Sequence, residues 1–79
     1  MPVTLNYFVE VDVYAEQEYY YGTIEAEGKT IYSHEDKLKS FAYKSDMVRD
    51  LHRIAAENGY EVVDINDNAV SISSWEEYL

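Results

Sequence analysis

The strict alternation of residues 5–13 (LNYFVEVDV) constrains the fold more than any other feature of this sequence. A period of two places successive side chains on opposite faces of a β-strand. One face would carry Leu5, Tyr7, Val9, Val11 and Val13. The other would carry Asn6, Phe8, Glu10 and Asp12. The pattern therefore predicts a half-buried strand, with one face on a core and the other in solvent.

A second strand is expected after the polar residues 15–18 turn the chain. If Tyr14 lies opposite Tyr19, then Val9 falls opposite Ile24, and the apolar side chains of both strands share one face. A third strand follows a tight turn at Glu27 and Gly28, because glycine accepts the positive φ that such turns need. This turn would pair residue 26 with residue 29, and residue 24 with residue 31.

The next segment with a clear period is helical. Ser45 is a good N-cap, and Asn58 with Gly59 is a typical C-terminal signal. Between these signals, one apolar stripe at helical spacing contains Met47, Val48, Leu51, Ile54 and Ala55. His52 is expected to face solvent. Residues 33–44 fit neither period, so we expect a loop that ends in a short extended segment.

After the helix, residues 61–66 and 69–73 flank a turn at Asp67 and Asn68 and predict a second hairpin with its valines and isoleucines inward. Residues 74–77 have capping-box spacing and predict one helical turn that lays Trp75 on the core. The expected fold is a single α+β domain over residues 1–79. Its antiparallel sheet has four to five strands in the order ββ(β)αββ, and one main helix covers one face.

Charge sets the class of partner. The 79 residues include 16 Asp or Glu against 6 Lys or Arg, a formal net charge of −10. Nucleic acids and anionic membranes are recognised by clusters of Lys and Arg, so direct binding to either is not expected. The natural partner is cationic. The chain has no cysteine, and we read neither a leader nor a membrane-spanning run, which fits a soluble cytoplasmic protein.

Acidic and aromatic residues alternate in the first third of the chain, where residues 1–28 contain no Lys or Arg. Alternate strand positions hold carboxylates about 6.7 Å apart, from two rises of about 3.3 Å, a spacing comparable to that of successive phosphates. Tyrosine adds rigid contact area at low entropic cost. The bland interpretation is that the acids confer solubility and the tyrosines fill cross-strand pairs.

Catalytic and metal sites find little support. Asp64, Asn66 and Asn68 imitate the first half of a calcium loop, but Ala69 replaces its glycine. His34 with the neighbouring acids Glu35 and Asp36 makes a weak zinc set. No phosphate loop or cofactor motif is present, so we expect no enzyme activity, no cofactor and no metal.

By size, acidity and a hairpin-rich α+β layout, with acids at Glu10, Asp12, Glu25 and Glu27, the chain resembles small phage-encoded inhibitors of the anti-CRISPR and anti-restriction type, several of which are DNA mimics. The resemblance implies a viral, non-catalytic inhibitor that acts in the cytoplasm of the host cell. It would block the positively charged nucleic-acid groove of a bacterial defence complex.

We therefore expect the partner to be a basic nucleic-acid-binding protein or complex. The expected contact residues are Glu10, Asp12, Tyr14, Glu16, Glu18, Tyr19, Tyr21, Glu25 and Glu27. The alternative is an interaction or assembly module that pairs with a partner subunit, or with itself as a homodimer, through its Tyr-rich sheet face. Salt distinguishes the two, because only the electrostatic interface weakens steeply as ionic strength rises.

Overall fold

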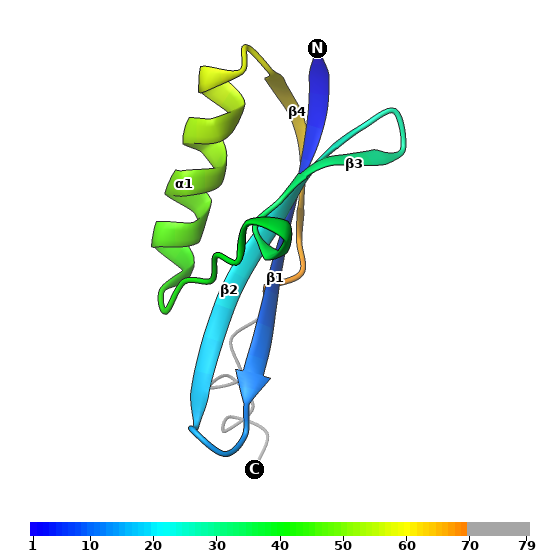
Figure 1. Cartoon of the computed structure of the whole chain (residues 1–79). Helices are drawn as coiled ribbons and strands as arrows, with labels where there is room; N and C mark the ends of the chain where they lie inside the picture. The colour runs from blue at the N-terminus through cyan, green and yellow to red at the C-terminus, as the bar shows by residue number, and fades with distance from the viewer. Residues whose placement is uncertain (70–79) are drawn as a thin grey trace.

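The computed structural model describes residues 1–69, which form a four-stranded sheet with one long helix on one face (Figure 1). The elements, in chain order, are β1 (Pro2–Asp12), β2 (Gln17–Ala26), β3 (Lys29–Ser33), the short 3-10 helix η1 (Glu35–Lys37), α1 (Lys44–Glu57) and β4 (Glu61–Asp67). The strands lie in the order β3-β2-β1-β4. The α+β class and the single main helix are confirmed for these residues.

The prediction of a purely antiparallel sheet was wrong, because β4 runs parallel to β1. The cause is the short connection after α1. The helix ends beside the start of β1, where the N–H of Glu61 donates to the carbonyl oxygen of Met1 at 2.8 Å. A strand that begins there must follow β1 in the same direction, as Figure 1 shows.

The first strand of the expected second hairpin is present as β4 (Glu61–Asp67). Its side chains were expected to point inward, but Val63 is 60% exposed and Ile65 is 45% exposed. A register shift opposite Val3 and Thr4 displaces this edge strand from a regular ladder. The remainder of that hairpin and the helical turn at Trp75 lie outside the described residues.

The core lies between α1 and one face of β1 and β2. Its buried side chains are Val3, Leu5, Tyr7, Tyr20, Ile24, Ala26, Met47, Leu51, Ile54, Ala55 and Ala69. The helical stripe is thus confirmed at four positions, with Val48 partly buried beside them. The helix begins one residue before the predicted cap, since Tyr43 is the N-cap and its side chain makes no capping bond. It ends as expected at Asn58, and Gly59 has φ 71°.

The first hairpin has a different register from the one predicted. Leu5 pairs with Ile24, and Val9 pairs with Tyr20. The turn closes early because Oδ1 of Asp12 accepts the backbone N–H groups of Tyr14 at 3.0 Å and of residue 15 at 3.1 Å. The shift is an even number of residues, so the side chains within β1 and β2 keep their predicted faces, whereas Val13, predicted on the buried face, lies in the turn and is 77% exposed.

The second hairpin turn is confirmed, with Ala26 opposite Lys29 and positive φ at both Glu27 and Gly28. A bulge then places Tyr32, not Ile31, opposite Ile24. The bulge leaves Ile31 40% exposed at the edge of the sheet.

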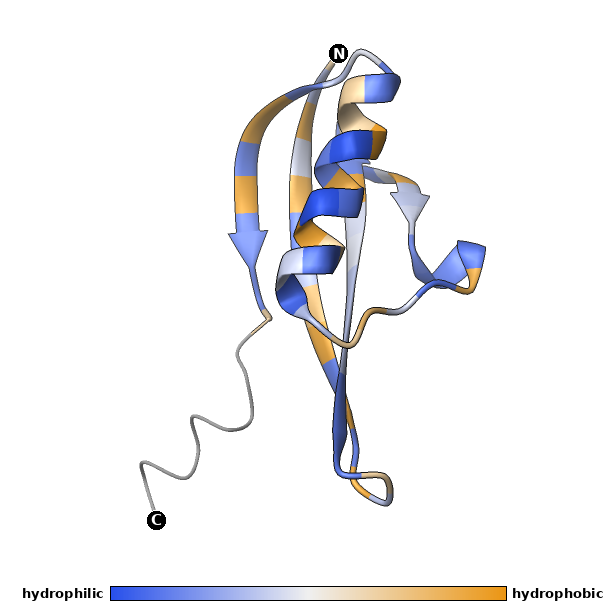
Figure 2. Ribbon diagram, turned by 90° about the vertical axis from the view of Figure 1, so that its left-hand side faces the viewer, coloured by the Kyte–Doolittle hydropathy of each residue, from blue (hydrophilic) through white to orange (hydrophobic). Residues whose placement is uncertain are grey.

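Residues 34–43, between β3 and α1, form the expected loop with an extended end, and η1 lies within this loop. After η1, Phe41 makes a β-bridge with Tyr20, with backbone N···O distances of 2.7 and 2.9 Å. The loop therefore runs along the edge of β2 where β3 has ended. Figure 2 shows that the β1–β2 hairpin extends well past the N-terminal end of α1, so the helix leaves its tip uncovered.

Candidate functional site

The face of the sheet opposite α1 brings acids and aromatic rings together along β1 and β2. Glu10 pairs with Tyr19, and Phe8 pairs with Tyr21. The rings of Phe8 and Tyr21 are stacked, with centroids 5.3 Å apart. We call this surface the open face. Its aromatic rings reinforce one another across the strands, as cross-strand pairs do.

The predicted acids do not form one continuous row. Glu25 pairs with Thr4, six positions along β1 from Glu10. At a rise of about 3.3 Å per residue, that separation is about 20 Å. Glu27 lies farther still, in the β2–β3 turn. The observed register, and not the sequence pattern, divides the acids between the two ends of the face.

A neutral belt crosses the open face between these ends. Nδ2 of Asn66 donates to Oδ1 of Asn6 at 3.0 Å, and Nδ2 of Asn6 donates to Oγ1 of Thr23 at 3.1 Å. Three strands are thereby joined by side-chain amides. Asp64 and Asn66 of the segment that resembled a calcium loop lie in β4, and the side chain of Asn66 links β4 to β1.

The hairpin tip carries the next group of predicted residues. Tyr14 is 102% exposed, and Val13 beside it is 77% exposed. Glu16 completes the turn with φ 53°. Glu18 is on the opposite face, because it pairs with Val11, and it accepts a hydrogen bond from Tyr20 at 2.5 Å. Glu18 therefore does not share a surface with Glu10.

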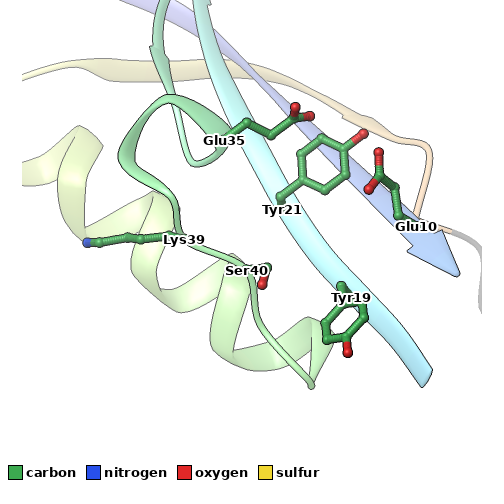
Figure 3. A pocket seen from close by; sticks show the side chains of 6 residues that line it. All are labelled: Glu10, Tyr19, Tyr21, Glu35, Lys39 and Ser40. Atoms are coloured by element: carbon green, nitrogen blue, oxygen red, sulfur yellow. The ribbon is translucent and has the colours of Figure 1, made fainter. Parts of the chain in front are cut away.

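A hollow of about 200 Å³ lies on the open face beside the loop that precedes α1 (Figure 3). Its lining residues are Glu10, Tyr19, Tyr21, Glu35, Lys39 and Ser40. The first three belong to the predicted surface. The last three come from the loop whose sequence has no period, so no sequence signal placed them here. The sequence suggests for Glu35 only the role of a metal ligand.

Two carboxylates flank one phenol in this hollow. In Figure 3 the side chains of Glu10 and Glu35 approach the hydroxyl of Tyr21 from opposite sides. Burial first, and then the charges and hydrogen bonds of these two acids, raise the pKa of Tyr21. The phenol stays protonated at neutral pH, but its single proton can satisfy only one carboxylate at a time. The hollow is therefore rich in acceptors and poor in donors.

Four of the chain's cations, Lys39, Lys44, Arg49 and Arg53, are engaged in ion pairs. All 6 Lys and Arg lie in residues 29–53. Lys39 lines the hollow, but its Nζ points away in Figure 3 and lies 4.0 Å from Oδ2 of Asp50. Lys44 pairs with Asp67 at 2.6 Å. Within residues 1–69, the ion pairs all fall on acids of α1 and β4. None of these ion pairs involves a carboxylate of the open face.

Both histidines have structural partners. His34 is fully buried, and its Nε2 lies 2.9 Å from Oδ2 of Asp50. His52, which was expected to face solvent, is half-buried, and its Nε2 lies 2.7 Å from the hydroxyl of Tyr7. Among residues 1–69, no three His, Asp or Glu side chains gather as a metal site would require.

No protein-family model, curated protein or solved structure matches this chain. In the part of the chain that the structure describes, no helix has both the length and the apolar character needed to cross a bilayer.

Proposed function

We propose that this protein is a non-catalytic inhibitor that binds a basic nucleic-acid-binding protein through the hollow and the adjoining hairpin tip. The observation that carries the proposal is the pair of carboxylates, Glu10 and Glu35, around the Tyr21 hydroxyl with no ion pair to them among residues 1–69. A basic groove that holds DNA or guide RNA presents cations that could pair with these two carboxylates. A bacterial defence complex in the host cytoplasm is the partner class that the resemblance to phage inhibitors implies.

The hollow fits an arginine side chain of the partner. A guanidinium group is planar, so it can donate to two carboxylates while it stacks on a tyrosine ring. Glu10 and Glu35 supply the carboxylates, and Tyr19 and Tyr21 supply the rings. Long-range attraction from the net charge of −10 would speed the encounter and make it sensitive to salt.

The second candidate function is an assembly module, and two observations favour it. The neutral belt interrupts the acidic row, and the exposed Val13 and Tyr14 offer an apolar, aromatic tip. A partner subunit gripped mainly by this tip would bind with little dependence on salt.

The decisive experiment is competition. Immobilised protein captures partners from a bacterial lysate at low salt, and a salt gradient elutes them. Each purified partner is then incubated with labelled DNA or RNA and increasing amounts of this protein. The proposal expects competitive displacement of the nucleic acid. A partner that holds both ligands at once would reject the mimic and favour the assembly module.

A matched pair of variants links the result to the hollow. Glu10→Lys changes the charge by the same amount as Glu61→Lys, and both side chains are exposed on strands. The first should abolish competition, whereas the second, at the start of β4, should change it only slightly. Circular dichroism would verify that both variants remain folded. Equal losses would show that net charge, and not the hollow, determines affinity.

A further inference from the structure

His34 is 0% exposed, and both of its ring nitrogens are engaged. The backbone N–H of Gly22 donates to Nδ1 at 2.9 Å. Nε2 lies 2.9 Å from Oδ2 of Asp50. Because Nδ1 accepts a hydrogen bond, it carries no proton, and Nε2–H is the donor to Asp50. The geometry therefore specifies a neutral imidazole with one defined tautomer.

The groups around the ring come from three segments. Tyr32 on β3 meets it edge-on with centroids 5.6 Å apart, and Phe41 lies 5.0 Å away. On α1, Oδ1 of Asp50 also binds Arg53 at 2.6 Å. Lys39 is 4.0 Å from Oδ2 of Asp50. Asp50 is thus already shared among Arg53, Lys39 and the imidazole.

Burial has the largest effect on the ring and lowers the pKa of His34. The hydrogen bond and charge of Asp50 oppose this shift, Lys39 adds to it, and the net direction is downward. Protonation at Nδ1 would also turn an acceptor into a donor that faces the N–H of Gly22. Two buried donors would then face each other, and both would lose a hydrogen bond.

The segment that follows His34 is held to β2 by few bonds. The N–H of His34 donates to the carbonyl oxygen of Gly22 at 3.0 Å, and Phe41 exchanges bonds of 2.7 and 2.9 Å with Tyr20. Between these anchors lie η1 and residues 38–40. This segment supplies Glu35, Lys39 and Ser40 to the hollow.

We propose that His34 is an acid-sensitive latch, whose protonation in mildly acidic solution releases residues 34–41 from the edge of β2 and takes the hollow apart. The inference goes beyond the proposed function and does not depend on it. The core between α1 and the sheet of β1, β2 and β4 stays packed, because the imidazole hydrogen-bonds to Gly22 and Asp50 and not to a side chain of the core cluster.

Linkage fixes the size of the effect. We assume that His34 is protonated only when residues 34–41 are released, with an ordinary histidine pKa of about 6.5. The equilibrium constant for this release then rises about tenfold between pH 7.5 and pH 5.5. Asp50 does not titrate in this window, because its pKa is lowered further from an already acidic value.

The experiment is amide hydrogen exchange on the full chain, read by NMR at pH 7.5 and pH 5.5 and corrected for intrinsic exchange rates. The amides of His34 and Phe41 should lose about tenfold in protection. Those of β1 and α1 exchange through larger openings that also free His34, so they should lose a similar factor but stay more strongly protected than the amides of His34 and Phe41 at both pH values. His34→Asn retains an oxygen near the position of Nδ1 to accept from Gly22, but it does not titrate. The pH dependence should vanish in this variant, even if protection is lower at both pH values.

His52→Gln is the matched control, since it removes the other imidazole and should leave the effect intact. Three outcomes would overturn the latch. One is unchanged protection in the unmodified protein. The second is the same pH dependence in His34→Asn. The third is a protection of the His34 and Phe41 amides at pH 5.5 equal to that of the β1 and α1 amides, which would mean that the whole domain opens together.

Discussion

Gly22 on β2 lies directly against Leu51 on α1, so that a Cβ at residue 22 would stand 2.6 Å from Cδ2 of Leu51. The same Cβ would be 3.0 Å from the carbonyl oxygen of Asn6 and 3.3 Å from Sδ of Met47. The helix can approach the sheet this closely only because residue 22 has no side chain. The backbone N–H of this glycine also donates to His34, so one position serves both the core and the latch.

Gly22→Ala should therefore destabilise the protein by roughly 1–3 kcal/mol through overpacking. Urea unfolding followed by circular dichroism measures the change. Leu51→Ala frees space above the new methyl group, so the double variant should be more stable than the sum of the two single effects implies. Additive effects would show that contact with Leu51 is not the cause of the stability lost in Gly22→Ala.

Asp12 stabilises the hairpin turn, because its Oδ1 accepts hydrogen bonds from two backbone N–H groups there. This role does not require a negative charge. Asp12→Ala should reduce stability by about 0.5–1.5 kcal/mol, the usual value of a lost hydrogen bond. Asp12→Asn keeps the acceptor oxygen and should be close to neutral. Urea unfolding of both variants makes the comparison. If they are equally destabilised, the charge and not the turn is what matters.

Tyr14 should contribute to binding and not to stability, because its side chain is 102% exposed at the hairpin tip. Tyr14→Ala is expected to change the free energy of unfolding by less than about 0.5 kcal/mol. It should weaken the captured partner's affinity by about fivefold or more, equivalent to about 1 kcal/mol. Calorimetric titration gives the affinity. Tyr43→Ala, 69% exposed just before α1, is the control and should bind normally.

Asp50 should stabilise the protein at neutral pH and lose this effect in acid. Burial alone would raise the pKa of Asp50, but hydrogen bonds from Arg53 and His34, with the charge of Lys39, outweigh it and lower the pKa. The unfolded chain therefore takes up the proton first as the pH falls below about 5. The stabilisation is complete above the ordinary aspartate pKa of about 3.9, and it disappears as the pH falls through the lower folded value.

Asp50→Asn should cost about 1.5–3 kcal/mol at pH 7, as expected for hydrogen bonds to charged groups. The difference in the free energy of unfolding between this variant and the unmodified protein should shrink towards pH 3. Urea unfolding across this range checks both statements. Asp46→Asn removes an exposed pair with Arg49 at 3.8 Å and the charge of an acid in the first turn of α1, and it should cost less than about 1 kcal/mol. If Asp50→Asn lost the same stability at every pH, the lowered pKa assigned to Asp50 would be wrong.

Much of the fold follows from local patterns. The alternation in residues 5–13 determined which face of β1 is buried, and it did so even though the hairpin register was wrong, because an even shift preserves the faces. The helical stripe and the Asn58–Gly59 end depend on spacing and backbone preference within α1 itself. The turn at Gly28 depends likewise on one glycine with φ 76°.

The sequence alone thus determined the α+β class, the buried faces of the strands and helix, and a first third of the chain without cations. Only the tertiary structure decided that β4 runs parallel to β1, that the acids divide between two ends of the open face, and that Glu35 joins Glu10 around Tyr21. These features depend on contacts between residues far apart in the chain. Such contacts produce no periodic pattern in the sequence. They depend on where the turns and loops place each strand or helix, and not on the side chains within one element.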